Sequence, residues 1–175
     1  RYGLVGSEMC IRDRNKSLNQ LIARHASFRT VFTKDKTGVG VQKILDKLEL
    51  KLVAEKLDNK AKGKALEKII KAEVNKEVST PFDFVKGPLI RVRLFEVKGG
   101  EHVFVLNHHH IISDGVSVDI ILKELSEFYQ ANLEKREPKL EKLPIQYVYF
   151  AAWQRAEFKK PEFQEKLTYW KDTLG

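Results

Sequence analysis

Two apolar segments joined by a short glycine-containing turn constrain the fold of this chain more than any other feature. Residues 89–109 contain two runs rich in β-branched and aromatic side chains, and Lys98-Gly-Gly-Glu101 connects them. Such a pair of runs predicts an antiparallel β-hairpin. Apolar side chains occupy every second position from Ile90 to Leu94, which is the spacing of one face of a strand.

The rest of the chain alternates between helical and strand-like patterns. Apolar residues at three- and four-residue steps predict helices, and β-branched or aromatic runs predict strands. Ser117 is expected to cap the third helix, and Trp153 is expected in the core because its neighbours are apolar. The predicted helices cover residues 17–27, 61–77, 118–134, 146–158 and 162–174, and the predicted strands cover residues 28–33, 41–45, 50–53, 89–97 and 102–108. This order predicts an α/β or α+β domain.

Composition excludes several classes of function. The chain has 175 residues, which suits one domain, and 42% of them are hydrophobic. No stretch approaches the roughly 20 apolar residues of a membrane span. A formal net charge of +8 would suit nucleic acid, but the lysines are interspersed with glutamates, and no RNA-binding aromatic motif or zinc-finger spacing occurs. We therefore expect neither a membrane nor a nucleic-acid partner.

The single cysteine and the first residues bear on compartment and origin. Cys10 cannot form an internal disulfide, and no signal peptide opens the chain, so a reducing cytoplasm is expected. Residues 1–14 show no clear helical or strand period and resemble a translated sequencing-adapter read-through, so we set them aside as artefactual. Because the chain begins with Arg rather than Met, residues 15–175 are expected to be part of a longer protein.

The residues most able to carry chemistry lie at the end of the predicted hairpin. His108, His109 and His110 follow one another there, and Asp114 and Gly115 come before the next predicted helix. In a strand, the first and third histidines would share one face and the second would face the other way. A histidine at a strand end can act as a general base, because its pKa lies near neutrality. Asp114 could fix the turn or pair with a distant arginine, and Gly115 would allow an unusual backbone conformation or close approach.

On the residues alone, other interpretations of this cluster stay open. The histidines could be structural. They could bind a metal if His25 or His102 approached them in space, although neighbouring residues of one strand converge poorly on one ion. A hydrolase with Ser113 or Ser117 as nucleophile is a further alternative, but the chain has no Gly-x-Ser-x-Gly elbow.

Four sequence blocks resemble, in order, those of the condensation domains of nonribosomal peptide synthetases. The segment from Asn107 to Ser117 resembles the active-site motif His-His-x-x-x-Asp-Gly. The upstream segment is similar to Arg-His-x-x-Leu-Arg-Thr-x-Phe but has Phe28 where Leu is usual and Ala26 where Glu is usual. The upstream block spans residues 24–32, the two further blocks span residues 81–94 and 144–154, and a final match covers residues 169–175.

This resemblance implies the fold of the chloramphenicol-acetyltransferase-like superfamily, an α/β sandwich whose mixed sheet is flanked by helices. Two such halves form a V in this family, and residues 15–175 resemble the first half, with the second half absent. The implied reaction is amide formation, in which the amine of an aminoacyl-phosphopantetheine carrier attacks the thioester of an upstream acyl or peptidyl carrier. The implied partners are these carrier-protein domains and an adjacent adenylation domain, and no metal or cofactor of the domain's own is implied.

The resemblance also assigns roles to individual residues. His110 is the second histidine of the motif and the catalytic one, and Gly115 would line the oxyanion position with its backbone N–H. His109 would pack or hydrogen-bond behind the site. Asp114 would be structural, through a salt bridge to an arginine of the upstream block, Arg24 or Arg29.

Three alternative functions share the motif or the fold. An epimerization domain inverts an α-carbon, but such domains usually lack glycine at the position of Gly115. A stand-alone acyltransferase would act on alcohols, and a non-catalytic module would only dock carrier proteins, against which the intact His110 and Asp114 argue. The isolated chain is expected to hold its site open to solvent and to be inactive, because the orientation of two tethered substrates needs a second wall.

Overall fold

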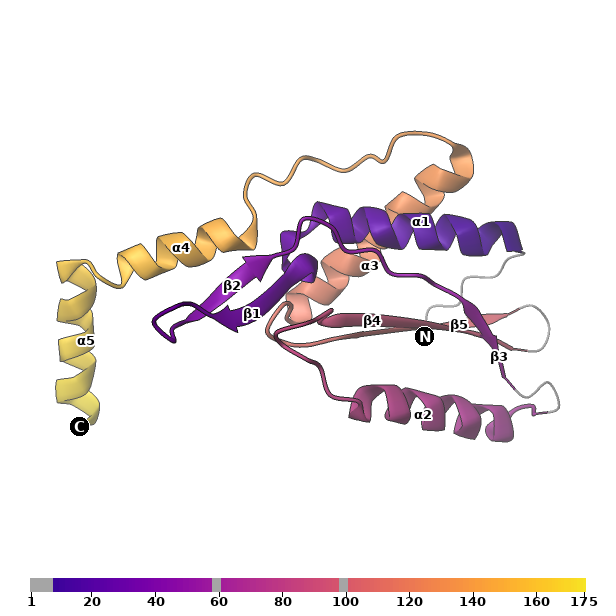
Figure 1. Cartoon of the computed structure of the whole chain (residues 1–175), viewed down its shortest axis with the longest axis horizontal. Coiled ribbons are helices and arrows are strands. Elements are labelled where there is room, and N and C mark those ends of the chain that lie inside the picture. Colours follow the sequence, from indigo (N-terminus) through magenta and orange to yellow (C-terminus); the bar gives the residue numbers. More distant parts are fainter. Residues whose placement is uncertain (1–7, 58–60, 98–100) are drawn as a thin grey trace. The chain divides into compact units, whose positions relative to one another are not determined.

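The computed structural model describes residues 8–57, 61–97 and 101–175, with side chains from residue 11 onward. The chain divides into two compact units, Arg1–Glu141 and Lys142–Gly175 (Figure 1). Every strand of the described residues lies in the first unit, and the second unit is helical.

A mixed sheet forms the centre of the first unit. β4 (Ile90–Glu96) pairs antiparallel with β5 (His102–His108), which confirms the predicted hairpin. Residues 98–100 of the predicted turn lie outside the described residues. β3 (Ala54–Lys56) runs parallel beside β4. The strand predicted at residues 50–53 is therefore wrong in position, because the segment that follows it is the one that pairs with β4.

Helices cover both faces of this sheet (Figure 1). α1 (Glu8–Arg24) and α3 (Gly115–Glu134) pack together on one face, and α2 (Lys64–Ser79) lies along the other. A mixed sheet between helices confirms the predicted α/β sandwich. α1 begins earlier than predicted and includes residues 8–14, while the foreign origin of residues 1–14 stays a prediction.

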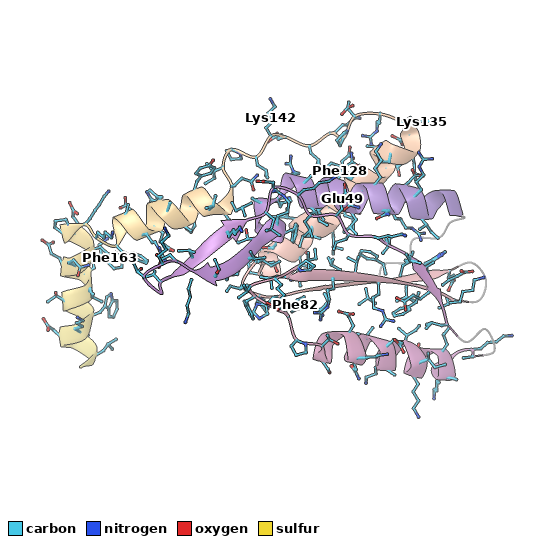
Figure 2. All side chains as sticks on the ribbon, in the orientation of Figure 1. Glu49, Phe82, Phe128, Lys135, Lys142 and Phe163 are labelled. Carbon is cyan, nitrogen blue, oxygen red and sulfur yellow. The ribbon has the colours of Figure 1, made fainter. Side chains whose placement is uncertain are left out.

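The core of the first unit lies between α1, α3 and the sheet. Leu18, Leu21 and Ile22 of α1 recur at the predicted helical spacing, and each is at most 1% exposed. Phe128 of α3 packs into the same cluster (Figure 2). The other buried members of this cluster are Phe28, Leu89, Ile90, Ile112 and Ile121. Burial of each such side chain stabilises the fold by about 1.5–3 kcal/mol, and Ile112 anchors the turn after β5 in this core.

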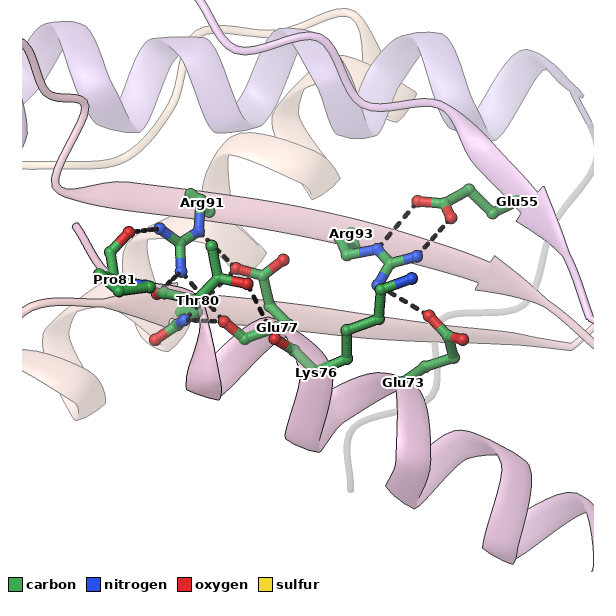
Figure 3. Close-up of polar contacts among 9 residues, drawn as sticks. Glu55, Glu73, Lys76, Glu77, Thr80, Pro81, Arg91 and Arg93 are labelled. Carbon is green, nitrogen blue, oxygen red and sulfur yellow. Dashed lines mark hydrogen bonds and ion pairs between the residues drawn. The ribbon is translucent and has the colours of Figure 1, made fainter. Parts of the chain in front are cut away.

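Arginines, rather than a buried apolar face, attach α2 to the sheet (Figure 3). None of the described residues of α2 is buried. Arg91 donates to the carboxylate of Glu77, and Arg93 makes a two-bond pair with Glu55 at 3.0 and 2.6 Å and a further bond to Glu73 at 2.9 Å. Hydrogen bonding to this guanidinium lowers the pKa of Glu55. Strand alternation explains the arrangement, since the arginines point away from the face that carries the core.

A smaller sheet and one glycine complete the surroundings of the core. β1 (Thr30–Lys34) pairs antiparallel with β2 (Gly40–Ile44). β1 begins later than predicted, because Ala26–Arg29 form a 3₁₀-helix. Gly87 has a φ of +65°, and a Cβ added there would lie 2.8 Å from Cγ1 of Val31. Only glycine therefore fits this position without strain.

The second unit consists of α4 (Tyr147–Glu157) and α5 (Pro161–Leu174), which confirms both predicted helices. Pro161 stands in the first turn of α5, where its missing N–H costs no helical hydrogen bond. Among the described residues 142–175, none is buried. Trp153 is 56% exposed, so the prediction that it lies in the core is wrong. The sequence pattern correctly placed it on a helix, but its side chain is exposed there.

Candidate active site

The turn that carries the histidines is attached to the structure at both ends. The backbone N–H of His109 donates to the carbonyl of Leu89 at 3.0 Å, which extends the β4–β5 pairing beyond His108. The N–H of Ile112 then donates back to the carbonyl of His109 at 3.1 Å, and the Ile112 side chain is buried in the core. His110 therefore lies in the turn rather than in the strand, so the strand alternation expected for it does not apply.

His110 is an exposed residue with a defined hydrogen bond. Its Nδ1 lies 3.1 Å from the carbonyl oxygen of Ser113. Because a carbonyl oxygen only accepts hydrogen bonds, Nδ1 must carry the proton. In the neutral ring the lone pair is then on Nε2. The turn thus selects the tautomer that leaves Nε2 as the basic atom of an accessible side chain.

His109 is occupied by packing. Its ring meets the rings of Phe82 and Phe84 edge-on, with centroid distances of 6.0 and 4.6 Å. Its Nδ1 accepts the backbone N–H of Ile111 at 3.0 Å. These contacts support the packing role expected of His109.

Asp114 caps α3 instead of pairing with an arginine. Its Oδ1 accepts the N–H of Ser117 at 2.8 Å and the hydroxyl of Ser117 at 2.6 Å, and its own N–H donates to that hydroxyl oxygen at 3.2 Å. These bonds lower the pKa of Asp114. The predicted salt bridge to Arg24 or Arg29 is therefore wrong. The assignment of Ser117 as the cap is also wrong, because Asp114 is the N-cap and Ser117 is the third residue of the helix, N3, in the capping box. A carboxylate is favoured at this position because the helix start offers free N–H groups and a positive dipole end.

Arg24 and His25 instead share a buried carboxylate, that of Glu124 on α3. Its Oε2 lies 3.1 Å from Nε of Arg24 and 2.6 Å from Nε2 of His25. Glu124 is 7% exposed and lies between the buried residues Ile121 and Phe128. Sequence reasoning missed this residue. The three- and four-residue steps that place it on the buried face of α3 were the available signal.

Arg29 uses its guanidinium to bind backbone carbonyls. It donates to the carbonyls of Leu45 and Asp46 at 2.5 and 3.4 Å, and to those of Ile22 and Ala23 at 3.3 and 3.4 Å. It therefore ties the end of α1 to the residues that follow β2. This role accounts for an arginine here without any contact to Asp114.

The upstream block nevertheless borders the turn. A cavity of about 80 Å³ is lined by His25 and Phe28 on one side, by Ser113 and Ser117 on the other, and by Ile121 among the residues of α3. The two sequence blocks are thus brought together in space, as their joint resemblance implied, although not through the predicted ion pair.

Gly115 is the first residue of α3 and is exposed. The N–H of a first helical residue has no acceptor within its helix. A Cβ added at Gly115 would meet nothing within 4 Å, and its φ lies outside the left-handed region. The expectation that glycine is needed here for an unusual backbone conformation is therefore wrong. What the position offers is an N–H without an acceptor in its own helix.

A contact between His108 and Ser113 joins the end of β5 to the far end of the turn. The Oγ of Ser113 lies 2.5 Å from Nδ1 of His108. Ser113 is 8% exposed, and burial, with a further contribution from nearby His110, lowers the pKa of His108. Sequence reasoning considered Ser113 only as a nucleophile. Nothing in the spacing indicated this contact, because it arises from the fold of the turn.

The three neighbouring histidines therefore have three different environments. Among the residues that the structure describes, no group of three or more His, Cys, Asp or Glu side chains is placed to hold a metal ion. None of the helices in the described part of the chain is long and apolar enough to span a bilayer.

Comparison with known sequences assigns the family. The family model of the Condensation domain matches residues 4–175. The chain belongs to the condensation-domain family. One component of the linear gramicidin synthase of Brevibacillus parabrevis is 39% identical over 91% of this chain and 2% of its own length. Malpibaldin synthetase of Mortierella alpina is 38% identical over 91% of this chain and 3% of its own length. The chain thus spans only a small part of the curated relatives it matches.

Solved structures show the same fold. The epimerization domain from the third module of tyrocidine synthetase B is 25% identical, with a TM-score of 0.74 over 97% of this chain and 37% of that one. The X-domain from teicoplanin biosynthesis is 24% identical, with a TM-score of 0.81 over 97% and 36% of the two chains. These likenesses confirm the chloramphenicol-acetyltransferase-like architecture of this condensation-domain chain.

Proposed function

We propose that this chain supplies the histidine-bearing half of a condensation site in a nonribosomal peptide synthetase, where an amide forms between two carrier-bound substrates. The observation that carries this proposal is the bond from Nδ1–H of His110 to the carbonyl of Ser113. It leaves Nε2 of an exposed ring as the basic atom. A general base of this kind needs a pKa near the working pH and an accessible lone pair.

The residues of the turn have separate parts in the reaction. The amine of the acceptor attacks the carbonyl carbon of the donor thioester, and Nε2 of His110 accepts a proton from that amine or holds it in position. The oxygen of the tetrahedral intermediate takes up negative charge, and the N–H of Gly115 donates a hydrogen bond to it. Collapse of the intermediate breaks the carbon–sulfur bond, and the departing thiolate takes up the proton. Asp114 contributes by fixing the start of α3.

The partners follow from this assignment. Acyl or peptidyl carrier domains present both substrates on phosphopantetheine arms, and an adenylation domain of the same synthetase loads the acceptor carrier. The domain itself requires no metal or cofactor, and the synthetase works in the cytoplasm. Residues 15–175 form the first half of the site, and the second half supplies the other wall. Exposure of His110 and Gly115 in this structure fits that division.

An epimerization domain is the second candidate, because one such domain shares this fold. The two candidates differ in what happens to the α-carbon of the bound residue. Epimerization exchanges its hydrogen with water and forms no new amide. Gly115 favours condensation, because the N–H of a first helical residue has no acceptor within its helix and suits an oxyanion.

The test uses the full-length synthetase with loaded donor and acceptor carriers in deuterated water. His110→Ala is expected to lower the rate of amide formation by about 10²–10⁴-fold. Ile111→Ala, which alters an exposed neighbour on the same turn, is the matched control and is expected to leave the rate within a factor of two or so. Full turnover by His110→Ala would overturn the proposal. Deuterium at the α-carbon without amide product would identify an epimerization domain instead.

A further inference from the structure

We propose that His108 is a positioning residue that acts through Ser113 to fix the tautomer and direction of the His110 ring. This inference rests on the proposed function of His110 and adds a residue to it. The contacts form a continuous chain: Nδ1 of His108 bonds the hydroxyl of Ser113, and the carbonyl of the same Ser113 accepts Nδ1–H of His110.

The first member of this chain is held rigidly. His108 is the last residue of β5 and lies opposite Ile90, which is completely buried in the core. The backbone of His108 is therefore fixed by the sheet. A side chain that hydrogen-bonds the turn from this position limits the movement of the turn relative to the sheet.

The second member links two bonds in one residue. Ser113 offers its hydroxyl to His108 and its carbonyl to His110. Because Ser113 is buried, its hydroxyl needs a partner within the protein. The contact with His108 holds Ser113 in its place in the turn, and loss of that contact, from either side, lets the residue and its carbonyl move.

The third member depends on the second. Among the described residues, the Ser113 carbonyl is the group that hydrogen-bonds the His110 ring. His110 is otherwise exposed. A movement of the Ser113 carbonyl therefore removes the group that selects the Nδ1–H tautomer. The basic nitrogen would then alternate between the two ring positions, and the ring would sample several directions.

The ionisation of His108 is compatible with this role. Burial lowers its pKa, and the proximity of His110 lowers it further. At neutral pH the ring is uncharged, so it holds Ser113 without placing a positive charge beside the catalytic histidine.

The test compares four variants in two measurements. His108→Leu and Ser113→Ala each break the chain of contacts, and His108→Asn keeps a side-chain amide that can bond the Ser113 hydroxyl. His102→Leu is the matched control, since it makes the same substitution at a buried position at the other end of β5. Nitrogen-15 NMR of the labelled 175-residue chain reports the tautomer of His110, and carrier-loaded assays of the full-length synthetase report kcat and KM.

In His108→Leu and Ser113→Ala we expect mixed His110 tautomers and a kcat lowered by about 10- to 100-fold, with KM unchanged. The double variant should be no worse than either single one, because both remove the same chain. His108→Asn should restore the wild-type tautomer and most of kcat. His102→Leu should leave both readings at their wild-type values even if it lowers the melting temperature.

The outcomes separate this inference from the proposed function. A wild-type tautomer and wild-type kcat in Ser113→Ala, together with an inactive His110→Ala, would overturn the role of His108 and leave the proposed function standing. A tautomer change without any effect on kcat would also overturn the positioning role. An active His110→Ala would instead remove the proposed function. Ser113→Ala deletes one hydroxyl, so it keeps the test valid if His108→Leu does not fold.

Discussion

The two units of this chain contain the same kinds of apolar residue but differ in how far those side chains are exposed. In the first unit, Leu21 of α1 is 0% exposed. In the second unit, Leu174 of α5 is 78% exposed, and Tyr169 of the same helix is 62% exposed. The difference is not one of helix formation, since both units form the helices that their sequences predict. It lies in whether a second apolar surface covers the helix.

What covers a helix decides its energetics. α1 packs against α3 and the sheet, so its apolar face is removed from water. The rings of α4 mainly meet each other, with Phe150 and Trp153 at a centroid distance of 5.5 Å. Such contacts contribute about 0.5–1.5 kcal/mol per pair, less than full burial of one ring. An exposed apolar strip of this kind is typical of a surface that binds another part of a protein.

The largest expected effect comes from replacing one buried leucine with alanine in the first unit. The same replacement of an exposed leucine in the second unit gives the comparison. Leu21→Ala should lower the free energy of unfolding by about 2–5 kcal/mol, because it leaves a cavity in the core. Leu174→Ala should change it by less than about 0.5 kcal/mol, because its side chain is already in water. Chemical denaturation of the 175-residue chain, followed by circular dichroism, measures both. Equal losses would show that the second unit is buried in solution and would break the comparison.

The second prediction applies the same comparison to ion pairs. Glu124→Ala should destabilise the fold by about 3 kcal/mol, because it leaves Arg24 and His25 without the carboxylate that they share in a largely buried place. Glu157→Ala in α4 removes the partner of Lys160, an exposed pair 2.7 Å apart, and should cost less than about 0.5 kcal/mol.

Melting curves of the two variants beside the wild type give the measurement. The double variant of Glu124→Ala with Arg24→Ala should be less destabilised than the sum of its single variants, since the two residues share one interaction. Strict additivity would show that the ion pair contributes nothing and that only packing around Glu124 matters.

Local patterns were sufficient to predict most elements of the fold. The hairpin of β4 and β5, the helical spacing on α1 and the limits of α4 and α5 follow from residue types that are near one another in sequence. Burial did not follow in the same way. The apolar residues around Trp153 have the pattern of a core helix, but whether they are buried depends on surfaces elsewhere, which a local pattern does not contain.

Around the candidate site, residue identities were predictable and partners were not. The sequence motif located the turn that carries His110. It did not locate the partner of Asp114, because a carboxylate there can accept hydrogen bonds from Ser117, three residues away, as readily as from a distant arginine. It also did not show that Arg24 pairs with Glu124, which is 100 residues away. Long-range polar pairs follow from the packing of elements, so they are the last feature that a sequence reveals.

The smallest expected effect concerns a partly exposed ion pair of the first unit, which should contribute as little as the ion pair of the second. Glu127 accepts hydrogen bonds from Arg136 and from the backbone of Lys139, and these bonds lower the pKa of Glu127 to about 2 from 4.5. A carboxylate with a depressed pKa stabilises the fold above its unfolded pKa and loses that contribution as the pH falls through the folded one. The pair should therefore contribute fully at neutral pH and progressively less from about 4.5 to about 2. Glu127→Gln should lower the melting temperature slightly at neutral pH, because solvent still screens a partly exposed pair. This difference from the wild type should shrink as the pH is lowered through that window. Arg136→Gln should show the same narrowing, because the guanidinium is the main cause of the depressed pKa. A melting-temperature difference that widens toward acid in both variants would show that the carboxylate is not held by these bonds. It would also show that partial exposure of an ion pair does not predict a small effect on stability in the first unit.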